Sequence, residues 1–396
     1  MAWMVLGASA MTATRPIRRP RPRRPVRTLA TLAAVATMTA LVPVIGPAPV
    51  QAQDSVGTSS LGETSPAATT AAAAPLRFKP PLRGLVVTEP RKLRTVPYAS
   101  SASMKLQWNA IETRPGVFDF SAVDRALDAH PQVRFRLRFK AGIHAPQWVK
   151  EDAGGCVLIT PDSANGGSGC AARFWRRSYR RDYLALMKAV AARYERDWQV
   201  VEIPNSACTT IYAEPFILGA DDASLDRLWR AGYTKRKHGR CVRRTTGQMI
   251  RLFPRTRVSL AGHSRWQYIV ARPGDERDGV REASWEAERR LLNKLLAAHG
   301  RHLVLEDHGL GPDDRECRTP GQPRRTAGSW YCYLAGLHRS AVAYGWQFTL
   351  NGGPMTEAAN AGVAMGACYL EYAAFDALTP TKRRNVHRAL RINCRE

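Results

Sequence analysis

The stretch Val133-Arg134-Phe135-Arg136-Leu137-Arg138-Phe139 carries an apolar residue at every second position, which is the period of a β-strand. A helical pattern follows at residues 183–194, where apolar residues recur on one face. Another short apolar run then occupies residues 199–203. Strand, helix and strand in this order predict a βαβ unit, in which the two strands are parallel.

The same alternation continues on both sides of this unit. Eight short apolar runs are separated by helix-like segments, which include residues 285–298, 331–343 and 382–390. The runs are 84–88, 104–108, 133–139, 199–203, 257–261, 302–305, 346–350 and 367–370. Eight such units favour an α/β fold of the (β/α)8 (TIM) barrel type over a doubly wound sheet, and no G-x-G-x-x-G follows the first run. We expect one barrel domain over residues 76–396.

Residues 1–52 have the three parts of a secretory signal peptide. An arginine-rich run is followed by an apolar stretch at 29–45, and Val50-Gln51-Ala52 offers small residues for cleavage. The alternative is a membrane anchor, but the apolar stretch is short and contains Thr and Pro. Residues 53–75 are mostly Ser, Thr, Ala and Gly, which predicts a disordered linker. We therefore expect a secreted monomer without a membrane span.

All 8 cysteines follow the linker, and none lies in a C-x-x-C pair. An even number behind a secretion signal favours disulfides over a zinc site, so no metal and no cofactor are expected. Nearest-neighbour pairing predicts the bridges 156–170, 208–241, 317–332 and 368–394. A mixture of bridged and free buried thiols is the alternative.

The formal net charge of +26 favours an anionic partner, such as an acidic glycan or an envelope polymer. The cations are scattered along the sequence, and no basic stripe is interleaved with aromatic residues. Secretion also argues against nucleic acid as the partner.

Chemistry in a parallel barrel is expected at the carboxyl ends of the strands. The residues that follow the eight runs are rich in carboxylates, His, Asn and Trp, a mixture typical of sugar sites. The candidates for substrate binding are Trp108, His144, Trp148, Asn205, His263, Asp307 and Asn351. For both tryptophans the alternative role is packing against loops.

Residues 108–121, W-N-A-I-E-T-R-P-G-V-F-D-F-S, resemble the second-strand segment of the clan A barrel glycosidases, closest to the family 42 β-galactosidases. A-P-Q-W-V at 145–149 and A-A-R-Y at 191–194 resemble the segments that follow strand three and precede strand four in those enzymes. The resemblance covers residues 84–215. It implies a structural role for Glu112, which anchors the turn before Gly116.

The resemblance also implies that Glu214, in Y-A-E-P, is the general acid/base. Two departures from the family pattern stand out. Ala213 replaces the expected Asn, and L-N-G-G at 350–353 has no carboxylate where the family nucleophile would follow strand seven. Glycoside hydrolysis requires a second carboxylate, and Glu306 and Glu371 are the candidates.

These observations predict a secreted glycoside hydrolase that acts on an oligo- or polysaccharide. Two alternatives stay open. One is a carbohydrate-binding barrel without turnover, which the missing carboxylate after strand seven motivates. The other is a basic protein associated with the cell envelope.

Overall fold

The computed structural model describes residues 77–161, 167–262, 267–269, 280–282, 285–311, 332–337, 344–348, 354–372 and 375–394. The chain divides into two units, Met1–Ala71 and Ala72–Glu396, and every described residue lies in the second. The predicted signal peptide and linker lie outside the described residues and stay predictions.

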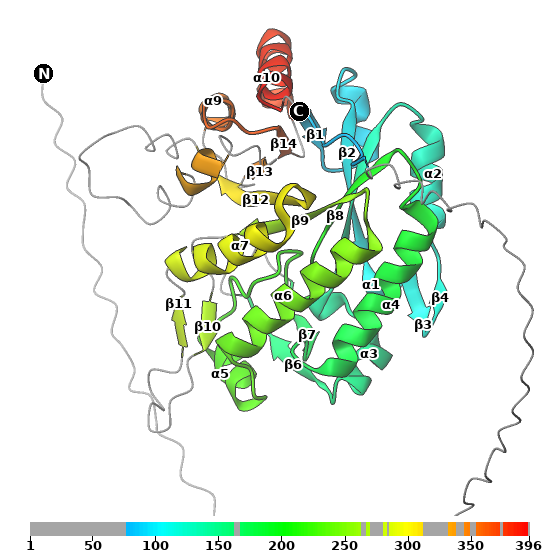
Figure 1. Cartoon of the computed structure of the whole chain (residues 1–396), viewed down its shortest axis with the longest axis vertical. Helices are drawn as coiled ribbons and strands as arrows, with labels where there is room; N and C mark the ends of the chain where they lie inside the picture. Colours follow the sequence, from blue (N-terminus) through cyan, green and yellow to red (C-terminus); the bar gives the residue numbers. More distant parts are fainter. Residues whose placement is uncertain are drawn as a thin grey trace, which may run out of the picture. The chain divides into compact units, whose positions relative to one another are not determined.

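Eight parallel strands form the central sheet, each at the place where the sequence predicts an apolar run (Figure 1). They are β1 (Gly84–Val87), β2 (Ser101–Gln107), β5 (Arg134–Lys140), β8 (Val200–Pro204), β9 (Arg257–Gly262), β12 (Leu303–Leu310), β13 (Tyr344–Phe348) and β14 (Tyr369–Tyr372). They pair in the closed order β1-β14-β13-β12-β9-β8-β5-β2, and β2 pairs in turn with β1. Smaller antiparallel ribbons join β3 (Glu112–Arg114) to β4 (Val117–Phe118), β6 (Cys156–Ile159) to β7 (Gly169–Ala172) and β10 (Gln267–Ile269) to β11 (Val280–Glu282).

Helices follow most of the strands. They are α1 (Trp108–Ile111), α2 (Ser121–Ala129), α3 (Gln147–Asp152), α4 (Arg177–Tyr194), α5 (Asp222–Arg230), α6 (Lys235–Leu252), α7 (Trp285–His299), a helix at 332–337, α9 (Met355–Ala364) and α10 (Pro380–Asn393). The α/β barrel-like architecture is thus confirmed. A full eight-fold alternation is not seen in the described residues, because only a 3₁₀ helix, Pro90–Thr95, lies between β1 and β2.

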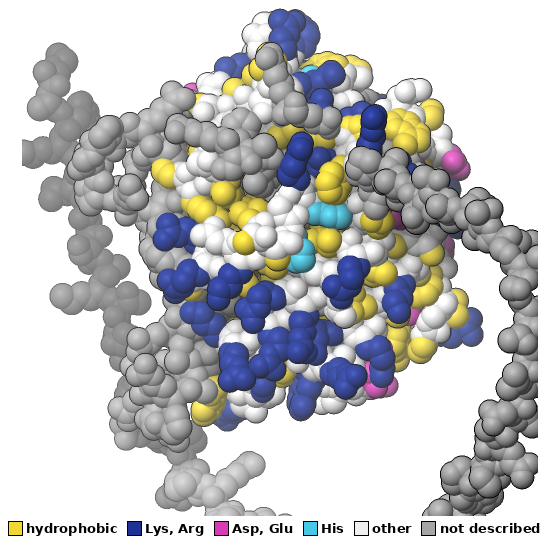
Figure 2. Space-filling model, viewed as in Figure 1, with side chains coloured by type: hydrophobic (Ala, Val, Ile, Leu, Met, Phe, Trp, Pro, Cys, Tyr) yellow, Lys and Arg dark blue, Asp and Glu magenta, His cyan; other side chains and the backbone are white. Residues whose placement is uncertain are grey.

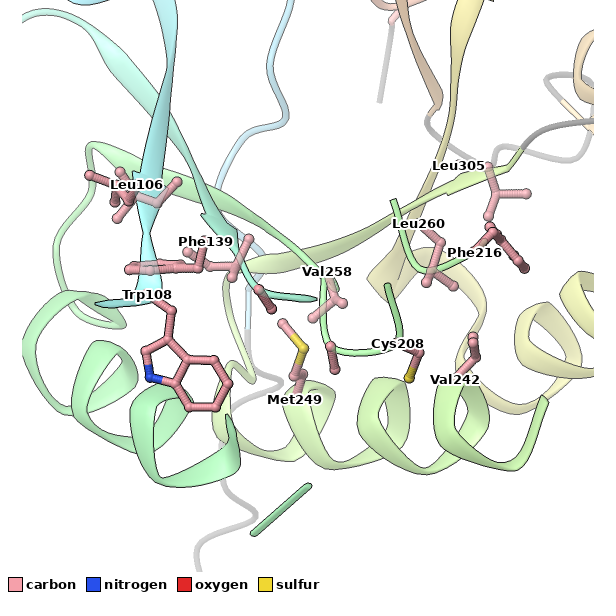
Figure 3. Close-up of a cluster of buried hydrophobic side chains, with 14 of the residues drawn as sticks. Leu106, Trp108, Phe139, Cys208, Phe216, Val242, Met249, Val258, Leu260 and Leu305 are labelled. Carbon is pink, nitrogen blue, oxygen red and sulfur yellow. The ribbon is translucent and has the colours of Figure 1, made fainter. Parts of the chain in front are cut away.

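The alternation along β5 separates two environments. Phe135, Leu137 and Phe139 are fully buried in the apolar core between sheet and helices. Figure 3 shows part of this core, where side chains of the strands meet Val242 and Met249 of α6. Burying a side chain of this size stabilises a fold by about 1.5–3 kcal/mol. The intervening arginines point to the other side of β5, into the interior of the barrel, because successive strand residues face opposite ways.

The barrel interior is tight at Gly345 of β13. A Cβ atom there would lie 2.0 Å from Cζ of Tyr369 on the neighbouring strand. We expect Gly345→Ala to lower the free energy of unfolding by about 1–3 kcal/mol in urea titrations, because the ring must shift. Gly336→Ala is the control, since a Cβ atom at Gly336 in the helix at 332–337 meets nothing within 4 Å. Equal stability of both variants would contradict the predicted overlap.

Three of the four predicted disulfides are confirmed, Cys156–Cys170, Cys208–Cys241 and Cys368–Cys394. Cys332 is also disulfide-bonded, while Cys317 lies outside the described residues. No described cysteine is free, which rules out a mixture of bridged and free thiols for this part of the chain.

On the face that Figure 2 shows, many Lys and Arg side chains lie over the region that α4 and α6 occupy in Figure 1. Helix α6 contains no Asp or Glu. Burial first, and then Arg244, Arg240 and Arg177, lower the pKa of Arg180, so these four cations lie near one another. Helices that are distant in sequence bring the arginines together, which a linear scan does not detect.

Among the described helices, none has the length and apolar character needed to cross a membrane.

Candidate functional site

Glu214 lies on the loop after β8, at the carboxyl ends of the barrel strands. The loop is fastened to three neighbouring elements. Cys208 is bridged to Cys241 of α6, and the Tyr179 hydroxyl of α4 donates to the Ala207 carbonyl at 2.8 Å. The Thr210 carbonyl accepts from the Ile143 amide at 2.8 Å.

Gly142 makes this close approach possible. Its φ is +58°, and a Cβ atom there would lie 2.1 Å from the Thr210 carbonyl oxygen. At the far end of the loop, the Pro215 carbonyl lies 2.8 Å from His238 Nε2. The loop is therefore held at several points, and it fixes the position of Glu214.

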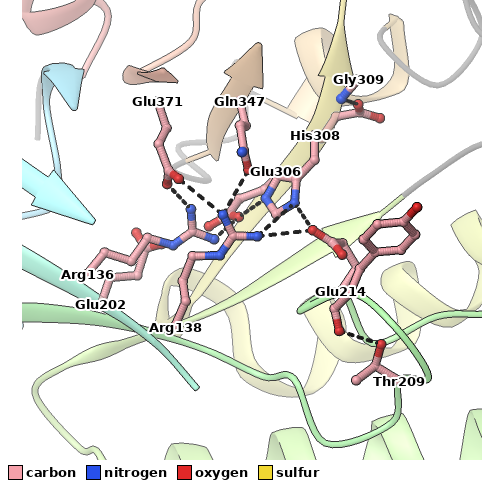
Figure 4. A network of polar contacts seen from close by, with 12 residues as sticks. Arg136, Arg138, Glu202, Thr209, Glu214, Glu306, His308, Gly309, Gln347 and Glu371 are labelled. Carbon is pink, nitrogen blue, oxygen red and sulfur yellow. Dashed lines mark hydrogen bonds and ion pairs between the residues drawn. The ribbon is translucent and has the colours of Figure 1, made fainter. Parts of the chain in front are cut away.

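Arg136 of β5 lies at the centre of a buried charge network inside the barrel (Figure 4). Its Nη1 donates to Glu371 Oε2 at 2.6 Å, its Nη2 forms a short ion pair with Glu306, and its Nε lies 3.1 Å from Glu202 Oε1. The Tyr369 hydroxyl lies 2.8 Å from Glu306 Oε1 and 3.1 Å from Glu202 Oε1. These five side chains are at most 2 % exposed. Branched apolar side chains would ordinarily fill this space.

Arg138 extends the network toward the carboxyl ends of the strands. Its Nη1 donates to Glu371 Oε1 at 3.1 Å and to Gln347 Oε1 at 2.9 Å, and its Nη2 donates to Glu214 Oε1 at 3.1 Å. His308 of β12 joins two carboxylates, because its Nδ1 makes a short contact with Glu214 Oε1 and its Nε2 lies 2.8 Å from Glu306 Oε2. Arg138 Nη2 also lies 3.3 Å from His308 Nδ1.

Glu214 and His308 form the least buried part of the network, with side chains 12 % and 11 % exposed. Glu214 Oε2 is buried and has no hydrogen-bond partner among the described residues. A buried acceptor without a donor costs about 1–3 kcal/mol. This oxygen is therefore a place where a hydroxyl of a ligand, or a water molecule, can donate.

The protonation states follow from the contacts. Burial alone would raise the pKa of Glu214, but His308 and Arg138 outweigh it and hold the pKa well below its ordinary value. Burial and Arg138 act to lower the pKa of His308, but Glu214 and Glu306 together raise it. These contacts thus favour the shared proton on His308 over Glu214, and Glu214 is ionised at neutral pH. In the free protein, Glu214 is therefore a carboxylate and not a carboxylic acid that holds its own proton.

The remaining carboxylates separate into two classes. Burial opposes the ionisation of Glu306 and Glu371, but Arg136 outweighs it and lowers the pKa of both. Burial and the neighbouring Glu306 raise the pKa of Glu202 well above its ordinary value. The network therefore favours ionised carboxylates at Glu214, Glu306 and Glu371, whereas Glu202 is the carboxyl group that holds a proton most readily.

The structure brings Glu214, Glu306 and Glu371 together, but it places other candidates elsewhere. Trp108 is fully buried against Tyr179 and Tyr183, and its Nε1 donates to Glu112 at 2.7 Å. The expected stacking of Trp108 on a sugar is therefore corrected, since packing covers the ring. Glu112 also accepts from the Gly116 amide at 2.9 Å, which confirms its predicted structural role.

Asn205 and Asp307 are likewise not ligand-facing. Asn205 is fully buried, its Nδ2 donates to Thr245 and Thr246 of α6 at 2.9 Å, and its Oδ1 accepts from the Ala207 amide. Its predicted substrate-binding role is corrected to that of a positioning residue for the Glu214 loop. Asp307 is 2 % exposed and alternates with inward-pointing neighbours, so it faces the helices.

Two of the remaining candidates stay compatible with ligand binding. His144 is half-buried, and burial followed by Lys140 and Lys150 lowers its pKa to about 4, so the ring is neutral at pH 7. Trp148 is half-buried, and its Nε1 has no hydrogen-bond partner among the described residues. His263 and Asn351 lie outside the described residues.

The site residues that the sequence predictions did not include are Arg136, Arg138, Glu202, His308 and Tyr369. The arginines alternate with apolar residues along β5. Helices cover the outer face of a parallel sheet, so charged residues at alternate positions of such a strand must point inward. That signal was present in the stretch that defines the fold.

In the part of the chain that the structure describes, no group of three or more His, Cys, Asp or Glu side chains is arranged to hold a metal ion. In the charge network the carboxylates converge on guanidinium groups instead.

No protein-family model matches the sequence, and no curated protein matches it. Solved structures do match. The catalytic domain of β-amylase from Paenibacillus polymyxa matches with a TM-score of 0.51 and 11 % identity, over 81 % of this chain and 100 % of that one. Endo-glycoceramidase II from Rhodococcus sp. gives a TM-score of 0.45 and 14 % identity over 79 % and 80 % of the two chains.

An endo-β-1,4-glucanase from Xanthomonas axonopodis pv. citri matches with a TM-score of 0.44 and 9 % identity, over 79 % of this chain and 95 % of that one. At these sequence identities the similarity concerns the fold alone, and the match to β-amylase supports it. The chain therefore has a fold found in glycoside hydrolases.

Proposed function

We propose that the protein is a secreted, monomeric glycoside hydrolase with a (β/α)8 barrel, and that Glu214 and His308 handle the proton of the reaction. One observation carries this proposal. The carboxylate that the family 42 resemblance selects lies after β8, contacts a protonated histidine, and has one oxygen without a partner among the described residues. The glycosidase-like fold and the disulfides support it.

In this mechanism a sugar hydroxyl donates to Glu214, which brings the glycosidic oxygen beside the carboxylate. The proton that rests on His308 is transferred across the short contact with Glu214, and Glu214 gives it to the leaving oxygen. The bond between the anomeric carbon and that oxygen breaks as a second carboxylate, or a water molecule that it activates, attacks the carbon. Glu371 and Glu306 are the candidates, since Arg138 joins the first to Glu214 and His308 joins the second.

The test is hydrolysis by the wild-type protein across aryl glycosides and neutral and acidic polysaccharides, measured as release of aglycone or reducing ends. We expect turnover on at least one glycan. Its absence on every substrate would contradict the proposal.

A carbohydrate-binding barrel without turnover is the second candidate. Glu306 and Glu371 are at most 1 % exposed and are paired with arginines, so neither reaches the surface unless a guanidinium moves. Retention on a polysaccharide column without any release of sugar would favour this function.

The basic face of α4 and α6 supports the third candidate, association with an anionic envelope. We expect wild-type protein retained on an immobilised polyanion at low salt to elute as the salt rises toward 1 M, because the screening length falls from about 10 Å at 0.1 M to about 3 Å at 1 M. A variant with Arg177, Arg240 and Arg244 changed to Gln should elute earlier. Identical elution of variant and wild type would exclude this face as the contact.

A further inference from the structure

The paired strands β2 and β5 carry a series of cations toward the mouth of the barrel. Lys105 is the register partner of Arg138, and Gln107 is the partner of Lys140. Register partners on parallel neighbouring strands point to the same face, as do residues two apart on one strand. Lys105 and Lys140 therefore share the interior face with Arg138, and Lys140 lies beyond it toward the carboxyl end.

The two lysines are more exposed than the two arginines. Arg136 and Arg138 are buried, Lys140 is half-buried and Lys105 is exposed. The two lysines thus lie where the charge network opens to solvent. A ligand that reaches Glu214 would approach both lysines, because Arg138, which donates to Glu214 at 3.1 Å, is the register partner of Lys105 and lies two residues before Lys140.

The carboxylates of the network below the lysines already have partners. Glu306 and Glu371 pair with Arg136, Glu371 and Glu214 pair with Arg138, and His308 contacts Glu214 and Glu306. Burial and the neighbouring Glu306 raise the pKa of the fourth carboxyl group, that of Glu202. The two lysines therefore add a net charge of +2 at the mouth.

No described residue forms a hydrogen bond or an ion pair with either lysine. Burial lowers the pKa of both, and the cation of Arg138 lowers it further. Both ammonium groups are thus partly desolvated beside another cation, where an anion would be stabilised.

We propose that Lys105 and Lys140 form a subsite for the carboxylate of an acidic glycan, beside Glu214. This inference rests on the proposed function, since it names the substrate class of that site. The proposed subsite is distinct from the basic face, because the two lysines line the mouth of the barrel and the basic face lies on helices α4 and α6.

The test compares binding of acidic polysaccharides with their neutral counterparts on the same backbone. The pairs are polygalacturonate and its methyl ester, alginate and its propylene glycol ester, and carboxymethyl- and hydroxyethylcellulose. We expect the wild type to bind the acidic member of at least one pair about tenfold more tightly at 0.1 M salt, and less so at 1 M. Lys105→Met/Lys140→Met should abolish that preference, and Lys188→Met, on the exposed surface of α4, should retain it.

Binding by affinity electrophoresis separates this inference from the proposed function, because it requires no turnover. The double variant should also unfold at a temperature no lower than the wild type, since it removes two unpaired cations. A wild type without preference in any pair, or a double variant that keeps it, would overturn the subsite. A preference for the acidic polysaccharide without any hydrolysis would instead support the subsite and contradict the proposed hydrolase activity.

Discussion

Replacing Arg136 by Met is expected to lower the free energy of unfolding by about 3–5 kcal/mol, the cost of removing one partner from a buried ion pair. The substitution leaves the buried carboxylates of Glu306 and Glu371 without their main cation. Both carboxylates would then gain protons, and the protein would unfold at lower urea concentration. Urea titration at pH 7, followed by circular dichroism, measures the change.

Arg230→Met serves as the control, because Arg230 pairs with Asp226 on the surface of α5 and the two side chains are 72 % and 50 % exposed. Its urea midpoint should match that of the wild type within error. A further variant, Arg136→Met with Glu306→Gln and Glu371→Gln, should recover part of the lost stability, because it removes the unpaired charges. An Arg136→Met protein as stable as the Arg230→Met protein would contradict the network.

Replacing His308 by Gln is expected to lower kcat/KM about a hundredfold, the contribution typical of a positioned proton donor. The His308 ring also sets the pH dependence of kcat/KM. Its pKa is raised above the ordinary value of 6.5, so the proton is present below that raised pKa and is lost as the pH rises through it. The wild-type rate should therefore fall on an alkaline limb that lies above pH 6.5.

In His308→Gln that limb should disappear, because Gln does not titrate. Gln147→Ala is a matched control, since Gln147 is exposed on α3 and its side-chain amide donates to Glu151. Its pH profile should equal that of the wild type. A wild-type profile without an alkaline limb, or one that His308→Gln leaves unchanged, would show that His308 does not supply the proton.

Strand positions could be predicted from the sequence because each strand is a short apolar run, and burial against the helices requires such runs. The ends of the strands could not be predicted in this way. Glu306 and Glu371 were expected just beyond the ends of their strands, but β12 runs to Leu310 and β14 to Tyr372. Hydrogen bonding to neighbouring strands continues through these polar residues, so hydropathy alone ends the strands too early.

The charge network is the part that sequence reasoning missed, although its signal lies in β5. Arg136 and Arg138 alternate with buried Phe and Leu, and in a closed parallel sheet only the barrel interior is left for them. Their partners on β8, β12 and β14 come from distant parts of the chain, and only the register of the strands brings them to one level. No local pattern identifies such partners.

Trp108 and Asn205 illustrate the opposite error. Both follow predicted strands, and both residue types are common in sugar sites. The nearby helices α4 and α6 supply their packing and hydrogen-bond partners, which the sequence does not place beside them. A position at a strand end indicates a site residue only when no helix covers it.

The most direct test of the central claim is kcat/KM for wild type and Glu214→Gln on whichever glycan the wild type cleaves. Gln keeps the shape of the side chain but has no carboxylate to relay the proton from His308. We predict a loss of at least about a hundredfold with unchanged thermal stability. If Glu214→Gln cleaves that glycan as fast as the wild type, Glu214 is not the acid/base, and the assignment of this site is wrong.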